Sequence, residues 1–201
     1  MSKPLKEQFL LTARFEEALT YAFRLHNGQT RKGTNVPYIS HLFAVTALVL
    51  QDGGDEDQAI AALLHDAVED QGGYQTLEEI RGRFGERVAW IVDGCTDTYE
   101  TPKPPWKGRK ERYLEHLRRA APEIRRVSLA DKLHNARTIV DDLRENGEQV
   151  WGRFNGGKTG TLWYYRTLLQ IFQSEGDSPL VLDLTRVVAE MQTLANGGER
   201  E

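Results

Sequence analysis

The segment ALLHDAVED, residues 62–70, places four titratable side chains in an apolar stretch: His65, Asp66, Glu69 and Asp70. Burying a charged group is costly unless it is paired with an opposite charge or coordinates a metal. A helix with these residues therefore requires either a solvated face or a bound cation. Imidazole and carboxylate groups are common ligands of divalent metals, and such metals activate water for hydrolysis.

Two residues elsewhere complete an N2O2 ligand set. His41 follows the segment PYIS, and Asp131 lies in the apolar segment VSLADKL. A single buried histidine or aspartate in a helix is more often a hydrogen-bonded core residue, but two imidazoles and two carboxylates together favour a divalent metal site. Their order, His41, then adjacent His65 and Asp66, then Asp131, resembles the H…HD…D pattern of the HD superfamily of metal-dependent phosphohydrolases.

Helix geometry adds a second pair of carboxylates beside these ligands. Glu69 lies four residues after His65, and Asp70 lies four residues after Asp66, so each pair is expected to share a helix face. The carboxylates would then stand about one turn, roughly 5 to 6 Å, beyond the ligands. A general base must lie there to take a proton from the attacking water. The alternative is that Glu69 and Asp70 form a solvated helix end.

Helical periodicity dominates the elements that must position these residues. No segment shows strand alternation, so the predicted fold is all-α. The resemblance to the HD superfamily implies an HD-domain helical bundle of about eight to ten helices in a single domain. This domain is predicted to span residues 1–195, and residues 196–201 are expected to form a disordered tail. The helices are predicted at about residues 4–26, 39–52, 56–71, 76–85, 87–96, 111–121, 122–146, 161–172 and 179–195.

Several of these boundaries carry local signals. Asp55 is predicted to cap the third helix, Pro122 to begin the seventh, and Ser178 to precede the last. The segment TLEE matches a capping box and predicts that the fourth helix begins at Thr76. Glycine- and proline-rich segments predict loops at residues 27–38, 99–110 and 153–160.

Composition limits the function classes. The chain has 201 residues and a formal net charge of −4, whereas nonspecific nucleic-acid binding usually shows as a basic domain or stripe. Cys95 is the only cysteine, which excludes an intrachain disulfide and a thiolate metal cluster. The beginning MSKPLKEQF lacks the apolar core of a signal peptide, and no segment has the roughly 18 apolar residues of a membrane span. We expect a cytoplasmic protein without nucleic-acid or membrane partners, and the sequence leaves its oligomeric state open.

Four collinear motifs, between about residues 22 and 137, make the resemblance more specific. HNGQTRKGTNVPYISH resembles an H-x-x-Q-x-R-K-x-G-x-P-Y-I-x-H segment, and AALLHDAVED resembles A-L-L-H-D-x-V-E-D. FGERVAWIVDGCTD and SLADKLHNART resemble F-G-x-x-V-x-x-L-V-x-x-V-T and K-L-A-D-x-L-H-N-x-R-T. All four belong to the hydrolase domain of RelA/SpoT-type proteins. The chain is similar above all to the stand-alone small alarmone hydrolases.

This resemblance implies a reaction and a role for each matching residue. The reaction is hydrolysis of the 3′-pyrophosphate of guanosine 3′,5′-bis(diphosphate), ppGpp, to GDP and pyrophosphate. The four ligands would hold one metal, usually Mn2+, while Glu69 and Asp70 would position and activate water. The implied substrate contacts are Arg31 and Lys32 to the base or its phosphates, and Asn135 and Thr138 in the nucleoside pocket.

The chain departs from the family at two positions. Leu42 follows the first ligand where the family often has proline, which leaves the imidazole unchanged. The loop after Arg31 and Lys32 is one residue longer, so contacts from it are expected to shift.

Further cations are candidates for binding the substrate's phosphates. The segment KPPWKGRK supplies Lys103, Lys107, Arg109 and Lys110. The segment RFNGGKTG supplies Arg153 and Lys158, and the following aromatic helix carries Tyr165 as a candidate for stacking on ribose or base. Of these, Lys107, Lys110, Lys158 and Tyr165 are taken as substrate-binding residues. The alternative is that the cations form a solvated surface and that Tyr165 belongs to the core.

Three functions from different classes remain open. The first is a Mn2+-dependent ppGpp hydrolase. The second is another HD phosphohydrolase, either an NADPH 2′-phosphatase or a nucleoside monophosphate phosphohydrolase. The third is a sensor that binds alarmone without cleaving it. The intact pair of Glu69 and Asp70 argues against a sensor, and Arg31 and Lys32 favour the first function over the second through resemblance alone.

Overall fold

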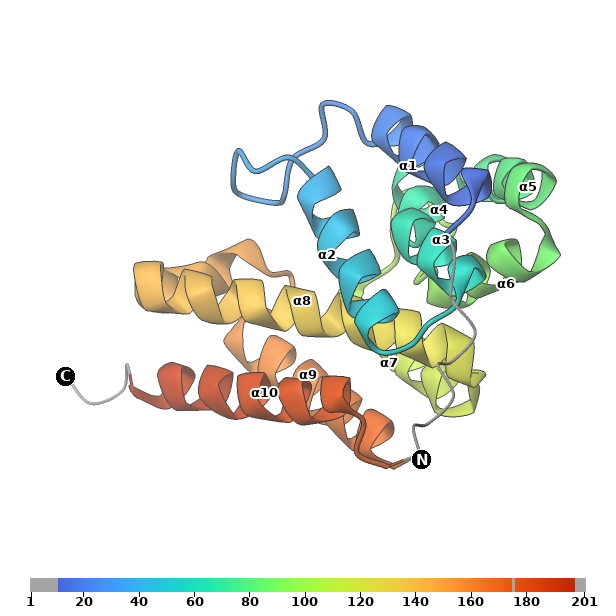
Figure 1. Cartoon of the computed structure of the whole chain (residues 1–201). Coiled ribbons are helices and arrows are strands. Elements are labelled where there is room, and N and C mark those ends of the chain that lie inside the picture. Colours follow the sequence, from blue (N-terminus) through green and yellow to red (C-terminus); the bar gives the residue numbers. More distant parts are fainter. Residues whose placement is uncertain (1–10, 175, 198–201) are drawn as a thin grey trace, which may run out of the picture.

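The computed structural model describes residues 11–174 and 176–197 and confirms the all-α prediction (Figure 1). In these residues the recorded β pairing is one isolated bridge between Thr30 and Pro37. The helices are α1 (Ala13–Leu25), α2 (Ile39–Gln51), α3 (Glu56–Leu64), α4 (Ala67–Gln71), α5 (Gly73–Phe84), α6 (Glu86–Cys95), α7 (Trp106–Arg119), α8 (Pro122–Asn146), the 3-10 helix η1 (Gly147–Arg153), α9 (Gly157–Gln173) and α10 (Pro179–Gly197). None of them, within the described ranges, is both long and apolar enough to cross a bilayer.

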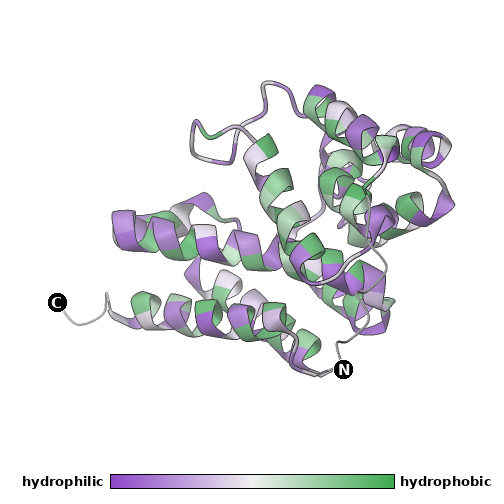
Figure 2. Cartoon of the chain, viewed as in Figure 1, coloured by the Kyte–Doolittle hydropathy of each residue, from purple (hydrophilic) through white to green (hydrophobic). Residues whose placement is uncertain are grey.

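Helix α8 is the central helix of the fold, against which most of the others pack. It packs against α10 on one side and against α2, α3 and α6 on the other, and Figure 1 shows it passing between these two groups. Its buried residues include Val127, Leu133 and Val140, which all join the single hydrophobic core. Figure 2 shows α2 as green or pale over most of its length, whereas α8 and α10 alternate purple and green. Asp131 on α8 thus faces His41 on α2 and His65, which directly follows α3.

Several predicted helix boundaries are confirmed by their caps. Asp55 accepts a hydrogen bond of 3.0 Å from the Gln58 amide at the start of α3. Ser178 accepts one of 3.3 Å from the Val181 amide at the start of α10, and Pro122 begins α8. Each cap satisfies a backbone group that the first helical turn leaves without a partner.

The N-terminal helix begins later than predicted. The described chain is not helical before Ala13, and residues 1–10 lie outside the described part. Thr12 caps α1, because its side chain accepts a hydrogen bond of 3.2 Å from the Arg14 amide while its own amide donates to Glu56 at 2.5 Å. This cap, together with the tie to α3, fixes the start of the helix.

The predicted third helix is divided at the metal-ligand pair. Helix α3 ends at Leu64, His65 and Asp66 form a turn, and α4 begins at Ala67. Adjacent residues on a regular helix do not face each other. The turn instead brings His65 Nε2 and Asp66 Oδ2 to 2.9 Å, so the irregularity serves the site.

Four other boundaries also differ from the predictions. Helix α5 begins at Gly73, whose φ of +61° allows the sharp turn after α4, and Thr76 is buried inside the helix rather than capping it. Helix α7 begins at Trp106, inside the predicted loop, and α9 begins at Gly157. Helix α10 includes residues 196 and 197 of the predicted tail, and residues 198–201 lie outside the described part.

Candidate active site

The four predicted metal ligands converge where α2, the α3–α4 turn and α8 meet. His41 Nε2 lies 3.3 Å from His65 Nε2, 3.5 Å from Asp66 Oδ2 and 3.2 Å from Asp131 Oδ1. Asp131 Oδ1 is also 3.7 Å from His65 Nε2. Both histidines are buried, and the Asp131 side chain is 7% exposed. Residues 90 positions apart in sequence thus share one site.

These distances fit a divalent metal ion. Metal–ligand bonds of about 2.1 Å place neighbouring ligand atoms roughly 3.0 to 3.4 Å apart. The atoms around His41 Nε2, at 3.2 to 3.5 Å, lie close to this spacing, and His41, His65 and Asp66 offer ligand atoms that all lie within 4.8 Å of one another. Two imidazole nitrogens and two carboxylate oxygens form a donor set that suits such an ion.

The imidazole rings are oriented by their second nitrogens. His65 Nδ1 lies 2.8 Å from the Ala62 carbonyl, which can only accept, so Nδ1 carries the proton and Nε2 presents a lone pair. His41 Nδ1 lies 2.8 Å from His134 Nδ1. Burial, reinforced by His41 and Arg31, lowers the pKa of His134 to about 4, so this ring is neutral near pH 7 and can accept from His41. Both ligand histidines then direct Nε2 toward the site.

The electrostatics of the cluster favour a positive charge at its centre. Burial alone disfavours a charged His65, yet Asp66 and Asp131 raise the pKa of its imidazole well above the usual value. Burial likewise disfavours ionised Asp66 and Asp131, but His65 holds the pKa of Asp66, and Lys132 that of Asp131, well below the ordinary range. The two carboxylates are therefore ionised and complementary to a cation.

The predicted catalytic carboxylates lie on α4, on the far side of the turn. The Asp70 amide donates to the Asp66 carbonyl at 3.0 Å, which confirms one-turn spacing for this pair. Lys103 Nζ lies 2.7 Å from Glu69 Oε1 and 3.5 Å from Asp70 Oδ1. Gln29 donates to Asp70 Oδ2 at 2.9 Å. Both carboxylates are thus fixed by partners from loops distant in sequence.

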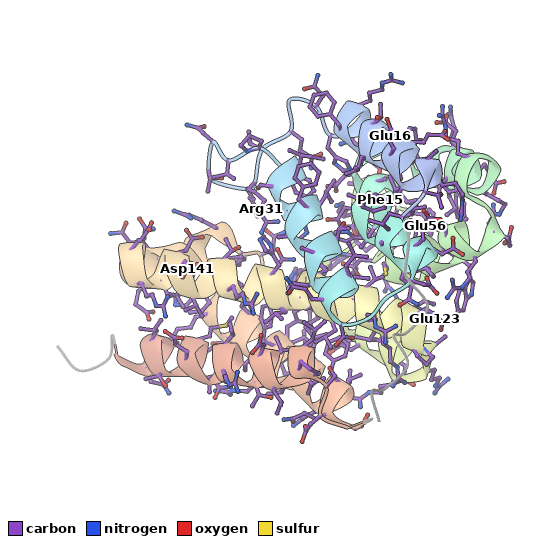
Figure 3. All side chains as sticks on the ribbon, viewed as in Figure 1. Phe15, Glu16, Arg31, Glu56, Glu123 and Asp141 are labelled. Carbon is purple, nitrogen blue, oxygen red and sulfur yellow. The ribbon has the colours of Figure 1, made fainter. Side chains whose placement is uncertain are left out.

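A chain of hydrogen bonds joins three predicted residues across the site. Arg31 Nη2 donates to Asn135 Oδ1 at 2.7 Å, and Asn135 Nδ2 donates to Asp131 Oδ1 at 2.5 Å. Figure 3 shows Arg31 between the loop before α2 and helix α8. Asn135 therefore connects a predicted substrate residue to a predicted metal ligand.

A cleft of about 390 Å³ opens beside the ligand cluster. Six predicted residues line it: Arg31, Lys32, Lys110, Asn135, Thr138 and Tyr165. Glu69 also lines it, as do the cationic side chains of Arg109, Lys132 and Arg153. This volume and this excess of cations suit a phosphorylated small molecule.

Two predicted substrate residues do not reach the cleft. Lys107 Nζ lies 2.9 Å from the centre of the Trp163 ring, and its side chain is 54% exposed. Lys158 lies in the first turn of α9, 3.2 Å from Glu148, and is not among the residues that line the cleft. Both predicted loops end earlier than expected, because α7 begins at Trp106 and α9 at Gly157, so each lysine lies in the first turn of a helix. Tyr165 does line the cleft although it is 4% exposed, so it serves the core as well.

Four residues at the site were not predicted. Tyr38 donates to Asp66 Oδ2 at 2.5 Å, and Lys132 Nζ lies 2.5 Å from Asp131 Oδ2. Asp97 holds Lys110 at 2.6 Å and contacts Arg109, while its amide donates to Glu69 at 3.3 Å. The fourth residue is His134. Lys132 and His134 flank predicted residues in SLADKLHN, and Asp97 ends the segment FGERVAWIVDGCTD, so both motifs carried a signal that sequence reasoning could have used.

Known proteins are similar to this chain in sequence. Residues 18–162 match the family model described as HD domain. The guanosine-3′,5′-bis(diphosphate) 3′-pyrophosphohydrolase MESH1 of Xenopus tropicalis is 40% identical over 138 residues, which are 67% of this chain and 72% of that protein. MESH1 of Danio rerio is 37% identical over 131 residues, 64% of this chain and 70% of that protein.

A solved structure gives the same fold. It is described as "A metazoan ortholog of SpoT hydrolyzes ppGpp and plays a role in starvation responses". Its TM-score is 0.71 at 25% identity, covering 94% of this chain and 98% of that one. The family resemblance and the helical-bundle prediction are both confirmed, and the chain belongs to the HD domain family.

Proposed function

We propose that this protein is a metal-dependent hydrolase that removes the 3′-pyrophosphate of ppGpp and leaves GDP. The observation that carries the proposal is the junction of the ligand cluster with the cationic cleft, where Glu69 lines the cleft and Asp131 is tied through Asn135 to Arg31. Relatives at 40% and 37% identity are named for this reaction.

A divalent metal, which we propose to be Mn2+, would be held by His41, His65, Asp66 and Asp131 and would supply Lewis-acid chemistry, lowering the pKa of water and neutralising phosphoryl charge. With a metal bound, the two histidines would present unprotonated Nε2 atoms, and the two carboxylates would balance the charge of the ion. Tyr38 and Asn135 hold the carboxylates of Asp66 and Asp131 in place.

In the proposed reaction, Glu69 accepts a proton from the attacking water, and Asp70 orients that water with it. A general base of this kind contributes typically 10²- to 10⁴-fold. Water attacks the phosphorus linked to ribose O3′, the bond from this phosphorus to O3′ breaks, pyrophosphate departs and O3′ takes up a proton. Lys103 fixes the Glu69 carboxylate in place, since its ammonium group lies 2.7 Å away.

The remaining predicted residues bind the nucleotide. Lys110, supported by Asp97, faces the phosphates, while Arg31 and Lys32 reach the nucleotide from the loop before α2. Asn135, Thr138 and Tyr165 line the nucleoside part of the cleft. The proposed partner is thus a small phosphorylated nucleotide. We also propose that the protein is located in the cytoplasm.

The test supplies chelator-treated protein with Mn2+ and offers ppGpp, NADPH and dAMP separately, with pyrophosphate and orthophosphate measured. The H65A/D66A variant is the control, and its circular dichroism checks folding. Pyrophosphate from ppGpp alone, lost in the variant, supports the proposal. Orthophosphate from NADPH or dAMP with ppGpp intact would assign a different substrate to the same metal chemistry. Binding of ppGpp without any product would indicate a sensor.

A further inference from the structure

Helix α8 arranges the cleft along its axis. Asp131, Asn135, Thr138 and Asp142 are spaced three or four residues apart, so they lie along one face of the helix. The last three line the cleft. Eleven residues separate Asp131 from Asp142, which corresponds to roughly 16 Å of helix. Asp142 therefore lies about three turns from the metal-ligand cluster, at the opposite end of the cleft.

The two ends of the cleft differ in chemistry. At the catalytic end, Lys132 contacts Asp131 at 2.5 Å, and Arg109 lies 3.7 Å from Glu69. The far end is formed by the ion pair of Asp142 with Arg153, with Phe154 and Ile139 as its apolar neighbours in the lining. Phosphates suit the first end, and a flat heterocycle with a polar edge suits the second.

The ion pair at the far end has unused hydrogen-bonding capacity. Arg153 Nη1 lies 3.2 Å from Asp142 Oδ2, yet this nitrogen is buried and makes no hydrogen bond within the described residues. Within those residues, Asp142 Oδ1 likewise has no recorded donor. The Arg153 stem is fixed against Gly33, whose position would place an added Cβ 3.2 Å from Arg153 Cδ. A buried, fixed donor and an adjacent acceptor facing one cleft are suited to a ligand edge that carries both groups.

We propose that Asp142 and Arg153 select guanine over adenine at this end of the cleft, an inference that rests on the proposed function. Guanine presents acceptors at O6 and N7 and donors at N1 and N2. Arginine is the usual partner of O6 and N7, and a carboxylate accepts from N1–H and the N2 amino group.

Adenine presents the opposite pattern of donors and acceptors at positions 6 and 1 of the base. Its N6 amino group directs hydrogens toward a guanidinium, and its N1 acceptor faces a carboxylate. Both contacts leave a buried polar group unpaired, and this kind of mismatch gives strong discrimination. The pair thus determines base preference while the chemistry remains at the other end of the cleft.

The test compares wild-type protein with Asp142→Asn on the 3′,5′-bis(diphosphates) of guanosine, inosine and adenosine. Inosine keeps O6, N7 and N1–H but lacks the N2 amino group. We expect the wild type to prefer guanosine over inosine and inosine over adenosine in kcat/KM. We expect Asp142→Asn to reduce the guanosine-to-adenosine ratio by roughly tenfold to a hundredfold.

The matched control is Asp141→Asn, one residue away on α8. The Asp141 side chain is 66% exposed, pairs with Arg144 and is labelled in Figure 3. This variant is expected to keep the wild-type ratio. A purely structural role for Asp142 would lower activity on all three nucleotides equally, and an unchanged ratio in Asp142→Asn would overturn the inference.

Calorimetric dissociation constants of the three nucleotides, measured on metal-free protein, separate this inference from the proposed function. If the wild type binds guanosine bis(diphosphate) most tightly and loses that preference in Asp142→Asn, but cleaves none of the three with Mn2+, then the proposed function fails and base selection stands. Equal binding of all three by the wild type would overturn base selection whatever the turnover.

Discussion

The side-chain amide of Asn135 donates a hydrogen bond of 2.5 Å to Oδ1 of Asp131, the same oxygen that lies 3.2 Å from His41 Nε2. The other end of the amide accepts from Arg31 at 2.7 Å. One neutral residue thus orients a proposed metal ligand and a proposed substrate-binding cation together. Residues that orient metal ligands are worth about 10- to 100-fold in metal affinity or activity.

Replacing Asn135 with alanine is therefore expected to weaken Mn2+ binding by about 10- to 100-fold and to raise KM for ppGpp, because Asp131 and Arg31 lose a shared partner. Calorimetric titration of metal-free protein with Mn2+ measures the first effect, and steady-state kinetics at saturating metal measures the second. Asn27→Ala, at an exposed position, is the control. If Mn2+ affinity stays at the wild-type value while KM rises, Asn135 acts on the substrate alone.

A substitution at Glu69 should lower turnover without weakening metal binding by the ligand cluster. Glu69→Gln keeps the side-chain size but removes the proton acceptor, so kcat is expected to fall by roughly 10²- to 10⁴-fold. Mn2+ affinity should change little, since the ligand atoms belong to other residues. Glu111→Gln is the matched control, because Glu111 is 56% exposed and pairs with Lys107 outside the cleft. A large loss of Mn2+ affinity in Glu69→Gln would make this residue a ligand rather than a base.

The convergence of the four candidate ligand residues was predictable, but the backbone that presents them was not. His41, His65, Asp66 and Asp131 are recognisable because their types and order suit one divalent metal. The division between α3 and α4 has no glycine or proline to mark it, and ALLHDAVED predicts a continuous helix. The turn is imposed by tertiary structure, because His65 and Asp66 must both face α8.

For the candidate substrate-binding residues, too, the sequence identifies the residues but not the contacts that they make. Arg31 and Asn135 were predicted, yet their contact spans 104 positions of sequence. Lys103 and Lys107 were equivalent cations in one segment, yet Lys103 lies 2.7 Å from Glu69 whereas Lys107 lies over the Trp163 ring. Charge and spacing identify such candidates, whereas their direction depends on contacts between distant elements.

Cys95 is expected to be unreactive in the folded protein. Burial raises the pKa of its thiol to about 11, and the thiol lies 3.9 Å from the Ile124 carbonyl. At pH 8 about one thiol in a thousand is then ionised, against about a quarter for an ordinary cysteine of pKa near 8.5. Iodoacetamide at pH 8 should label Cys95 much faster in urea than in buffer, as measured by intact mass. Equal rates in the two conditions would contradict the burial.

The raised pKa of the Cys95 thiol also determines whether its contribution to stability rises or falls with pH. Between about pH 8.5 and 11 the folded state keeps a proton that the unfolded state has lost, so the contribution of Cys95 falls as pH rises. Comparing urea midpoints of the wild type and Cys95→Ala at pH 8 and pH 10 measures this contribution. From pH 8 to pH 10, the urea midpoint of the wild type should fall relative to that of Cys95→Ala.

Two helical glycines should respond oppositely to alanine. Gly94 in α6 packs against α8, where an added Cβ would lie 2.4 Å from Ile124 Cδ1 and 2.8 Å from Cγ1. Gly82 in α5 has nothing within 4 Å of such a Cβ. Alanine favours a helix by about 1 kcal/mol over glycine, but overpacking a core costs typically 1 to 3 kcal/mol. Gly82→Ala should therefore raise the urea midpoint and Gly94→Ala lower it. A rise in both variants would mean that Ile124 can move aside, and that the interface between α6 and α8 is looser than its contacts indicate.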